Sequence, residues 1–139
     1  WHVQEYRVSK ASRATSMAGV GFDAFGWELF PYLSSGASVL LVNNEDRLSL
    51  GRLGDLFCQE GITHSFVATA MLWDLVRELS TRCTSLEYLL TGGDRLAGAN
   101  PGRLSYKLVN NYGPTENTVV ASNYILEPES GSYSSPSIG

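Results

Sequence analysis

The chain has 139 residues, of which 43% are hydrophobic, and this is enough for one globular domain or a part of one. Its 10 Lys and Arg against 14 Asp and Glu give a net charge of -4, without a basic cluster that would attract a nucleic acid or an anionic membrane. No apolar run approaches the roughly 20 residues that span a bilayer, and the first segment lacks the apolar centre of a signal peptide. We therefore expect a cytoplasmic protein without nucleic-acid or membrane partners.

Extended and helical patterns alternate along the chain. In chain order, the expected elements are a strand at 14–21, a helix at 24–33, a strand at 37–42, a helix at 48–60, a strand at 62–68, a helix at 69–80 and strands at 86–93, 106–113 and 118–126. The tail at 127–139 is rich in Ser and contains Gly and Pro, so it is expected to be a loop or linker. Cys58 and Cys83 lie far apart and outside any CxxC motif, which favours two reduced structural thiols.

This alternation indicates an α/β fold with a layered, largely parallel sheet and flanking helices. Ligands of such folds gather at the carboxyl ends of the strands. Three turns are expected at such ends: Phe22-Asp23, the Thr-Gly-Gly at 91–93 and the turn at 110–116. They are the candidate site.

The turn NNYGPTEN at 110–117 carries more chemistry than a chain reversal needs. Gly113 lets the backbone approach a ligand closely, which leaves the ring of Tyr112 free to lie against a flat heterocycle. Thr115 can donate to a phosphate oxygen, and Glu116 can help to hold Mg²⁺. On composition alone, an Asn-rich structural turn with Tyr112 in the core is the more common explanation.

The other two turns are also open to plain structural explanations. Asp23 can cap the helix that follows it, or it can be a carboxylate that pairs with the ammonium group of a ligand. The Thr-Gly-Gly turn alone does not define a phosphate site, because no GxxxxGK[ST] motif accompanies it.

Three segments resemble the adenylation domains of nonribosomal peptide synthetases. The turn NNYGPTEN resembles their nucleotide-binding NxYGPTE motif, and residues 21–42, GFDAFGWELFPYLSSGASVLLV, resemble their FDxSxWE…GA motif. Residues 86–96, LEYLLTGGDRL, resemble the LRxLxxGGExL segment between them. The order and spacing agree over nearly the whole chain.

The resemblance implies that residues 1–139 are an internal fragment of the large N-terminal subdomain of an adenylate-forming, acyl-CoA ligase-like enzyme. Such an enzyme uses Mg²⁺ and ATP to convert an amino acid into its aminoacyl adenylate, releases pyrophosphate, and passes the acyl group to phosphopantetheine on a peptidyl carrier domain. A condensation domain of the same synthetase is a further implied partner. The phosphate loop would precede Trp1 and the catalytic Lys would follow Gly139, so we expect the fragment alone to be inactive.

The resemblance also implies roles for individual residues. Tyr112 would stack on adenine, Thr115 would contact the α-phosphate, and Glu116 would bind Mg²⁺; Thr115 and Glu116 are thus the catalytic candidates. The cofactor-binding positions are Gly93, Asn110, Tyr112, Gly113 and Thr115. The substrate-binding positions are Asp23, Ala24, Trp27, Phe66, Leu90, Gly92, Asn111, Val119 and Val120.

Within that set, Asp23 would pair with the α-ammonium group, and the remainder would line an apolar pocket of moderate size. The set resembles the family's leucine-selecting pattern, so leucine is the expected substrate. Isoleucine and valine compete closely, because one methylene discriminates by only about 1–3 kcal/mol.

Two alternatives remain. An acyl-CoA or aryl-acid ligase would activate a carboxylic acid that lacks the ammonium group, and Asp23 argues against it. A noncatalytic α/β nucleotide-binding module belongs to a different class, and the sequence on either side of the chain would identify it.

Overall fold

The computed structural model of the chain describes residues 1–79, 85–98, 104–126 and 136–138. Within these ranges, six strands form one sheet in the order β2-β1-β3-β4-β5-β6. The strands are β1 (Arg13–Ser16), β2 (Ser38–Leu41), β3 (His64–Ala68), β4 (Tyr88–Gly92), β5 (Lys107–Tyr112) and β6 (Ser122–Leu126). Strands β1 to β5 are parallel, and β6 is antiparallel to β5. The expected α/β fold with a largely parallel sheet is confirmed.

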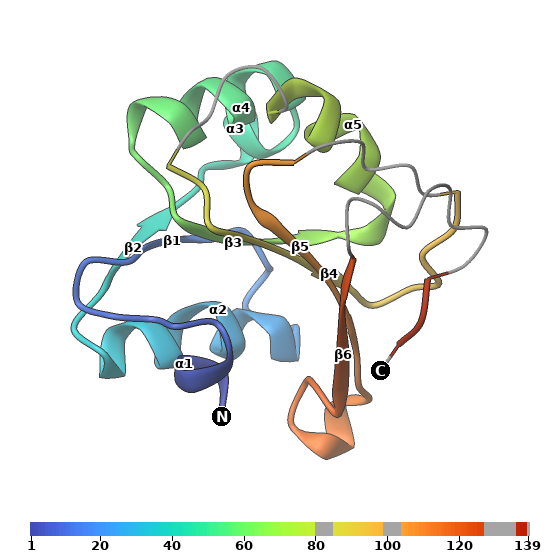
Figure 1. Ribbon diagram of the computed structural model, residues 1–139. Helices are drawn as coiled ribbons and strands as arrows, with labels where there is room; N and C mark the ends of the chain where they lie inside the picture. The colour runs from blue at the N-terminus through green and yellow to red at the C-terminus, as the bar shows by residue number, and fades with distance from the viewer. Residues whose placement is uncertain (80–84, 99–103, 127–135, 139) are drawn as a thin grey trace.

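Helices cover both faces of the sheet. They are α1 (His2–Glu5), α2 (Asp23–Ser34), α3 (Asn44–Arg47), α4 (Leu50–Gln59), α5 (Thr69–Leu79) and the short 3-10 helix η1 (Thr115–Asn117). Figure 1 shows α1 and α2 on one face and α3, α4 and α5 on the other. No helix among the described residues has the length and apolar character needed to cross a membrane.

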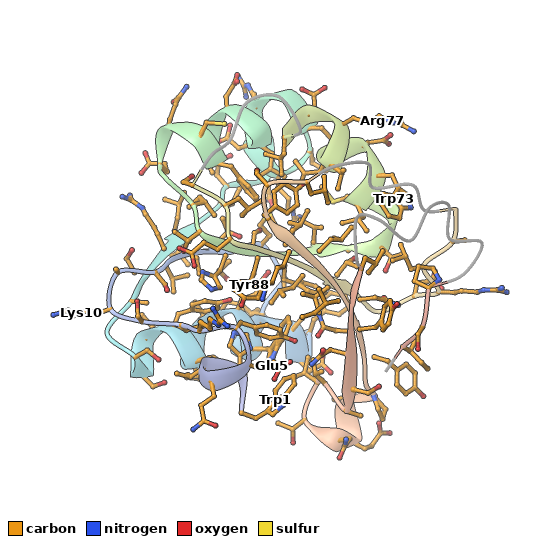
Figure 2. The ribbon with its side chains drawn as sticks, in the orientation of Figure 1. Trp1, Glu5, Lys10, Trp73, Arg77 and Tyr88 are labelled. Carbon is orange, nitrogen blue, oxygen red and sulfur yellow. The ribbon has the colours of Figure 1, made fainter. Side chains whose placement is uncertain are left out.

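Each face of the sheet has its own apolar cluster. Because side chains of a strand alternate between faces, Tyr88 and Leu90 of β4 join the cluster under α1 and α2, whereas Leu89 joins the cluster under α4 and α5. Figure 2 shows Tyr88 on the first side and Trp73 and Arg77 of α5 on the second. The α4–α5 cluster contains the fully buried Leu53, Phe57, Leu72 and Leu75.

The first predicted strand is too long. Strand β1 ends at Ser16, because the next two backbone N–H groups, of Met17 and Ala18, donate to the side chain of Glu28 and not to a neighbouring strand. Residues 17–22 therefore form a turn, which we call the β1–α2 turn.

The last predicted strand also begins later than expected. Strand β6 starts at Ser122, because Thr118 and Val119 adopt positive φ angles of 57° and 74° and cannot continue a strand. Cys58 is disulfide-bonded, which corrects the expectation of a reduced thiol, since distance along the sequence does not measure distance in space. Cys83 lies outside the described residues, as does most of the predicted loop at 127–139.

Candidate active site

The three predicted turns meet at the carboxyl ends of the parallel strands. Strands β3, β4 and β5 end in register there, since Ala68 pairs with Gly92 and Gly92 pairs with Asn111. Helix α2 starts at the same end of the sheet with Asp23, directly after the β1–α2 turn. Residues that are distant in sequence are thereby brought to one place, as the parallel topology predicts.

Asp23 joins two of these turns by a hydrogen bond. The hydroxyl of Thr115 donates to Oδ2 of Asp23 over 2.6 Å, although the two residues are 92 positions apart. Oδ1 of Asp23 accepts from the backbone N–H of Ala24 at 2.7 Å. Phe22, not Asp23, occupies the N-cap position of α2, so the plain helix-cap explanation does not describe this carboxylate. Asp23 is half-buried and faces a hollow.

That hollow has a volume of about 710 Å³, and its lining is largely apolar. Four of the expected substrate-binding residues line it: Asp23, Ala24, Phe66 and Gly92. The charged side chains of Glu28, Arg47 and Asp94 also line it, and the sequence analysis did not assign these to the site. Glu28 belongs to the quoted WE motif and could have been found there, whereas no sequence pattern marks Arg47.

Four further expected substrate-binding residues lie in the adjoining apolar cluster under α1 and α2. Leu90 and Trp27 are buried members of that cluster, and Val119 and Val120 pack against it. The ring of Phe66 connects the cluster to the hollow, since it packs edge-on against Trp27 with 5.4 Å between ring centroids. The apolar wall therefore continues behind the hollow.

Asn111 is the remaining expected substrate-binding residue, and it is buried and held on two sides. The hydroxyl of Tyr6 donates to its Oδ1 at 2.5 Å, and its Nδ2 donates to the carbonyl of Thr91 at 3.2 Å. Burial raises the pKa of Tyr6, so this phenol stays protonated and remains a donor.

A second hollow, of about 360 Å³, lies beside the first. It is lined by four of the expected cofactor-binding residues, Gly93, Asn110, Tyr112 and Gly113. The side chain of Asn110 is buried and donates to the carbonyl of Ser137 at 2.9 Å, while Tyr112 is 51% exposed. Gly93 and Asp94 line both hollows, so the two adjoin.

Gly113 is required by the close approach of two backbone segments. A Cβ at this position would come within 2.7 Å of the backbone N of Ala121 and of the Cα of Val120. Even Ala would therefore force the turn after β5 away from the segment that precedes β6. This explains structurally why the turn 110–116 contains glycine at this position.

The expected metal ligand, Glu116, lies on η1 with its side chain exposed. Within the described ranges, no group of three or more His, Cys, Asp and Glu side chains could hold a metal ion. A metal at this site would therefore need ligands from a bound substrate besides Glu116, as Mg²⁺ commonly takes from nucleotide phosphates.

Comparisons with known proteins agree with this arrangement. One component of the linear gramicidin synthase of Brevibacillus parabrevis is 43% identical over 139 residues, which is 100% of this chain and 2% of that protein. Surfactin synthase subunit 2 of Bacillus subtilis (strain 168) is 44% identical over 134 residues, which is 96% of this chain and 4% of that protein. The chain thus spans only a few per cent of the length of these relatives.

Among solved structures, the Vibrio cholerae adenylation domain AlmE in complex with glycyl-adenosine-5'-phosphate superposes with a TM-score of 0.84. The match covers 99% of this chain and 27% of that one, at 19% identity, and shows that the two share their fold. The family model of AMP-binding enzymes matches residues 1–139. The chain belongs to the AMP-binding enzyme family, and the predicted fold class of an adenylate-forming enzyme is confirmed.

Proposed function

We propose that the chain is an internal part of the adenylation domain of a nonribosomal peptide synthetase, and that this domain converts an amino acid and ATP into an aminoacyl adenylate and pyrophosphate. The proposal is supported by membership of the AMP-binding family and by the similarity to gramicidin and surfactin synthases over the full chain or nearly so. A peptidyl carrier domain with phosphopantetheine would receive the acyl group, and a condensation domain would use it.

The observation that carries the proposal is the direct contact between Asp23, which lines the larger hollow, and Thr115, which lies two residues after Gly113 of the smaller one. Asp23 supplies a carboxylate to the larger hollow, where an α-ammonium group would find its counter-charge. Thr115 belongs to the turn 110–116, whose first residues line the smaller one. An amino acid in the first hollow and a nucleotide in the second would have their reacting groups next to these two side chains.

The residues fit ATP in the smaller hollow. A Cβ at Gly93 would meet no atom within 4 Å, so this backbone faces open space where the two hollows adjoin. The half-exposed ring of Tyr112 offers a face for adenine, and Asn110 fixes one wall through its buried amide. Glu116 could hold Mg²⁺ together with the phosphates, and the ion would offset negative charge during displacement of pyrophosphate.

In the reaction, a carboxylate oxygen of the amino acid forms a bond to the α-phosphorus, and the bond from that phosphorus to the pyrophosphate oxygen breaks. Asp23 would hold the ammonium group and thereby orient the attacking carboxylate. Thr115 has one hydroxyl proton, so it would leave Asp23 in order to donate to an α-phosphate oxygen. Neither side chain transfers a proton in this scheme.

Leucine is the proposed substrate. Ala24 and Gly92 leave space beside Asp23, and the rings of Phe66 and Trp27 continue the apolar wall. Such a pocket would favour leucine over valine by roughly 10- to 200-fold, which is what one methylene contributes.

The test is amino-acid-dependent exchange of pyrophosphate into ATP by the complete domain, run with each common amino acid. We expect exchange led by leucine and abolished by Asp23→Ala. The matched control is Asp74→Asn, since Asp74 is an exposed residue of α5 that pairs with Arg77 at the surface.

Three other outcomes would contradict parts of the proposal. Exchange led by a charged or aromatic amino acid would refute the pocket assignment. Exchange with carboxylic acids that lack an amine would indicate an acyl-CoA or aryl-acid ligase. No exchange with any acid would indicate a noncatalytic nucleotide-binding module.

A further inference from the structure

Glu28 is a buried carboxylate that holds the β1–α2 turn. Its side chain projects from α2 and the residue is only 2% exposed. Oε2 accepts from the backbone N–H groups of Met17 and Ala18, each at 2.8 Å, and from the hydroxyl of Ser16 at 3.2 Å. These contacts join the turn to the first half of the helix that Asp23 begins.

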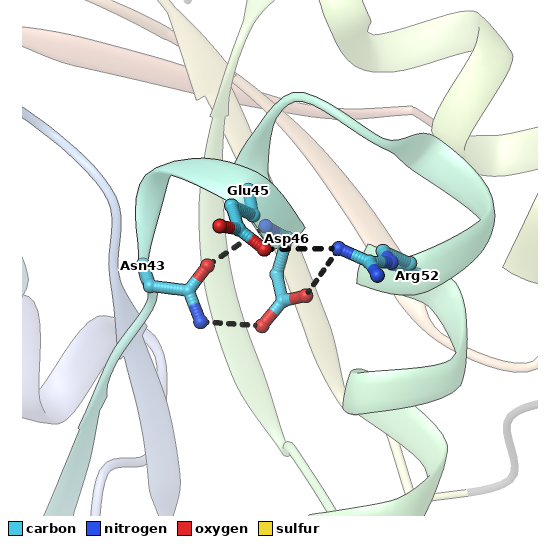
Figure 3. A network of polar contacts seen from close by, with 4 residues as sticks. All are labelled: Asn43, Glu45, Asp46 and Arg52. Atoms are coloured by element: carbon cyan, nitrogen blue, oxygen red, sulfur yellow. Dashed lines mark hydrogen bonds and ion pairs between the residues drawn. The ribbon is translucent and has the colours of Figure 1, made fainter.

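Arg47 holds the same turn from the other side. Its Nη1 donates to the carbonyl of Met17 at 2.8 Å, so both polar groups of the Met17 backbone are taken by charged side chains. Arg47 is the last residue of α3, which the capping bond from the N–H of Asp46 to Asn43 stabilises. Figure 3 shows this bond together with the contacts of Arg52 to the carboxylates of the same helix.

The β1–α2 turn is a wall of the larger hollow. Met17, Ala18, Gly19 and Phe22 all line it, and Asp23 follows Phe22 directly. A shift of this turn would therefore move the carboxylate of Asp23 relative to Thr115, its hydrogen-bond partner, and to Gly92, which also lines the hollow. Displacements near 1 Å are enough to change reaction rates by about 100-fold.

Burial of the Glu28 carboxylate costs free energy. Burial raises the pKa of Glu28, with opposing contributions from its hydrogen bonds and from Arg47, because desolvation disfavours the charged form. Oε1 has no hydrogen-bond partner among the described residues, which adds to the cost of burial. Removal of the side chain would leave the N–H groups of Met17 and Ala18 without their acceptor, so the conformation of the turn depends on Glu28.

We propose that Glu28, assisted by Arg47, is a positioning residue for the amino acid substrate: it fixes the β1–α2 turn and thereby the place from which Asp23 meets the ammonium group. The inference rests on the proposed function. It assigns no substrate contact to Glu28, which borders the larger hollow but is only 2% exposed and directs Oε2 to the turn.

The test uses pyrophosphate exchange by the complete domain, with KM measured separately for leucine and for ATP. Glu28→Ala is expected to raise KM for leucine roughly 10- to 100-fold, because the ammonium partner is misplaced. KM for ATP is expected to stay within about twofold of its original value, since the smaller hollow does not include the turn. General loss of structure would instead lower the amount of active protein and leave both KM values alone.

Glu28→Gln is the conservative variant. Its amide oxygen can accept from both backbone N–H groups, so it is expected to restore KM for leucine to within about threefold of the original. Glu87→Ala is the matched control, because Glu87 is an exposed glutamate on the stretch before β4. It is expected to change neither KM.

Arg47→Ala keeps the inference testable if Glu28→Ala fails to fold. It should raise KM for leucine in the same direction, and in the double variant the two effects should be less than additive, because both act through one turn. The inference is overturned if folded Glu28→Ala or Arg47→Ala leaves KM for leucine unchanged, or if Glu28→Gln is as impaired as Glu28→Ala. Absence of exchange in the unmodified domain would instead refute the proposed function.

Discussion

Gly92→Ala is a small change with a calculable steric consequence. Gly92 is the last residue of β4 and pairs with Asn111 of β5. A Cβ at Gly92 would lie 2.6 Å from the backbone carbonyl oxygen of Asn111, whereas ordinary contacts begin near 3.4 Å. The two strands would have to separate by about 0.8 Å, and overpacking of this kind costs about 1–3 kcal/mol. Because Gly92 also lines the larger hollow, KM for the amino acid should rise as well.

The assay is urea unfolding of the complete domain, together with pyrophosphate exchange. Gly51→Ala is the matched control, since a Cβ at Gly51 in α4 meets nothing within 4 Å. There the same substitution should stabilise the helix by up to about 1 kcal/mol. The steric reasoning is refuted if Gly92→Ala unfolds at the urea concentration of the original protein, or if both variants change stability in the same direction.

Three further predictions follow from burial and exposure. Phe57 is 0% exposed, and Phe57→Ala should lower the free energy of unfolding by about 3–5 kcal/mol. Phe30 is 71% exposed, so Phe30→Ala should have little effect on urea unfolding. Equal effects of the two substitutions would contradict the assigned core. Burial, with a contribution from His64, lowers the pKa of His2 to about 3 from its ordinary 6.5, so stability present above pH 6.5 should fall as the pH drops toward 3. His2→Phe should reduce the dependence of the unfolding free energy on pH by about 1.4 kcal/mol per pH unit, as measured by urea unfolding between pH 5.5 and 4. An unchanged dependence would show that His2 titrates normally. Tyr112→Ala should weaken ATP binding by about 1–3 kcal/mol, which KM for ATP in pyrophosphate exchange would report. Tyr112→Phe keeps the aromatic face and should leave KM for ATP unchanged. Equal losses of ATP binding in both variants would show that the hydroxyl, and not the ring, makes the contact.

The fold class was predictable because its signals are local. Apolar spacing identified α2, α4 and α5 nearly to their ends, since a helix satisfies its backbone hydrogen bonds within one segment. Buried strands that alternate with helices predict a largely parallel sheet. The short helices α3 and η1 were missed, because four or fewer residues do not establish a period.

Strand ends were less predictable, because their causes are distant in sequence. Nothing near Ser16 marks the end of β1; the cause is Glu28, twelve residues later in the chain, whose carboxylate takes the next N–H groups. Similarly, Val119 belongs to a residue type typical of strands, but the close contact between the Gly113 turn and the segment before β6 holds it in a left-handed conformation.

The sequence by itself determined which chemical groups the site contains and the order in which they occur, because the turn NNYGPTEN and the segment around Asp23 carry their residue types in short, continuous stretches. Only the tertiary structure decided which of these groups meet. The bond between Thr115 and Asp23, the sharing of Gly93 by two hollows, and the hold of Glu28 and Arg47 on one turn all join segments that no local pattern connects. Such contacts depend on the packing of the whole sheet, and local propensity carries no information about them.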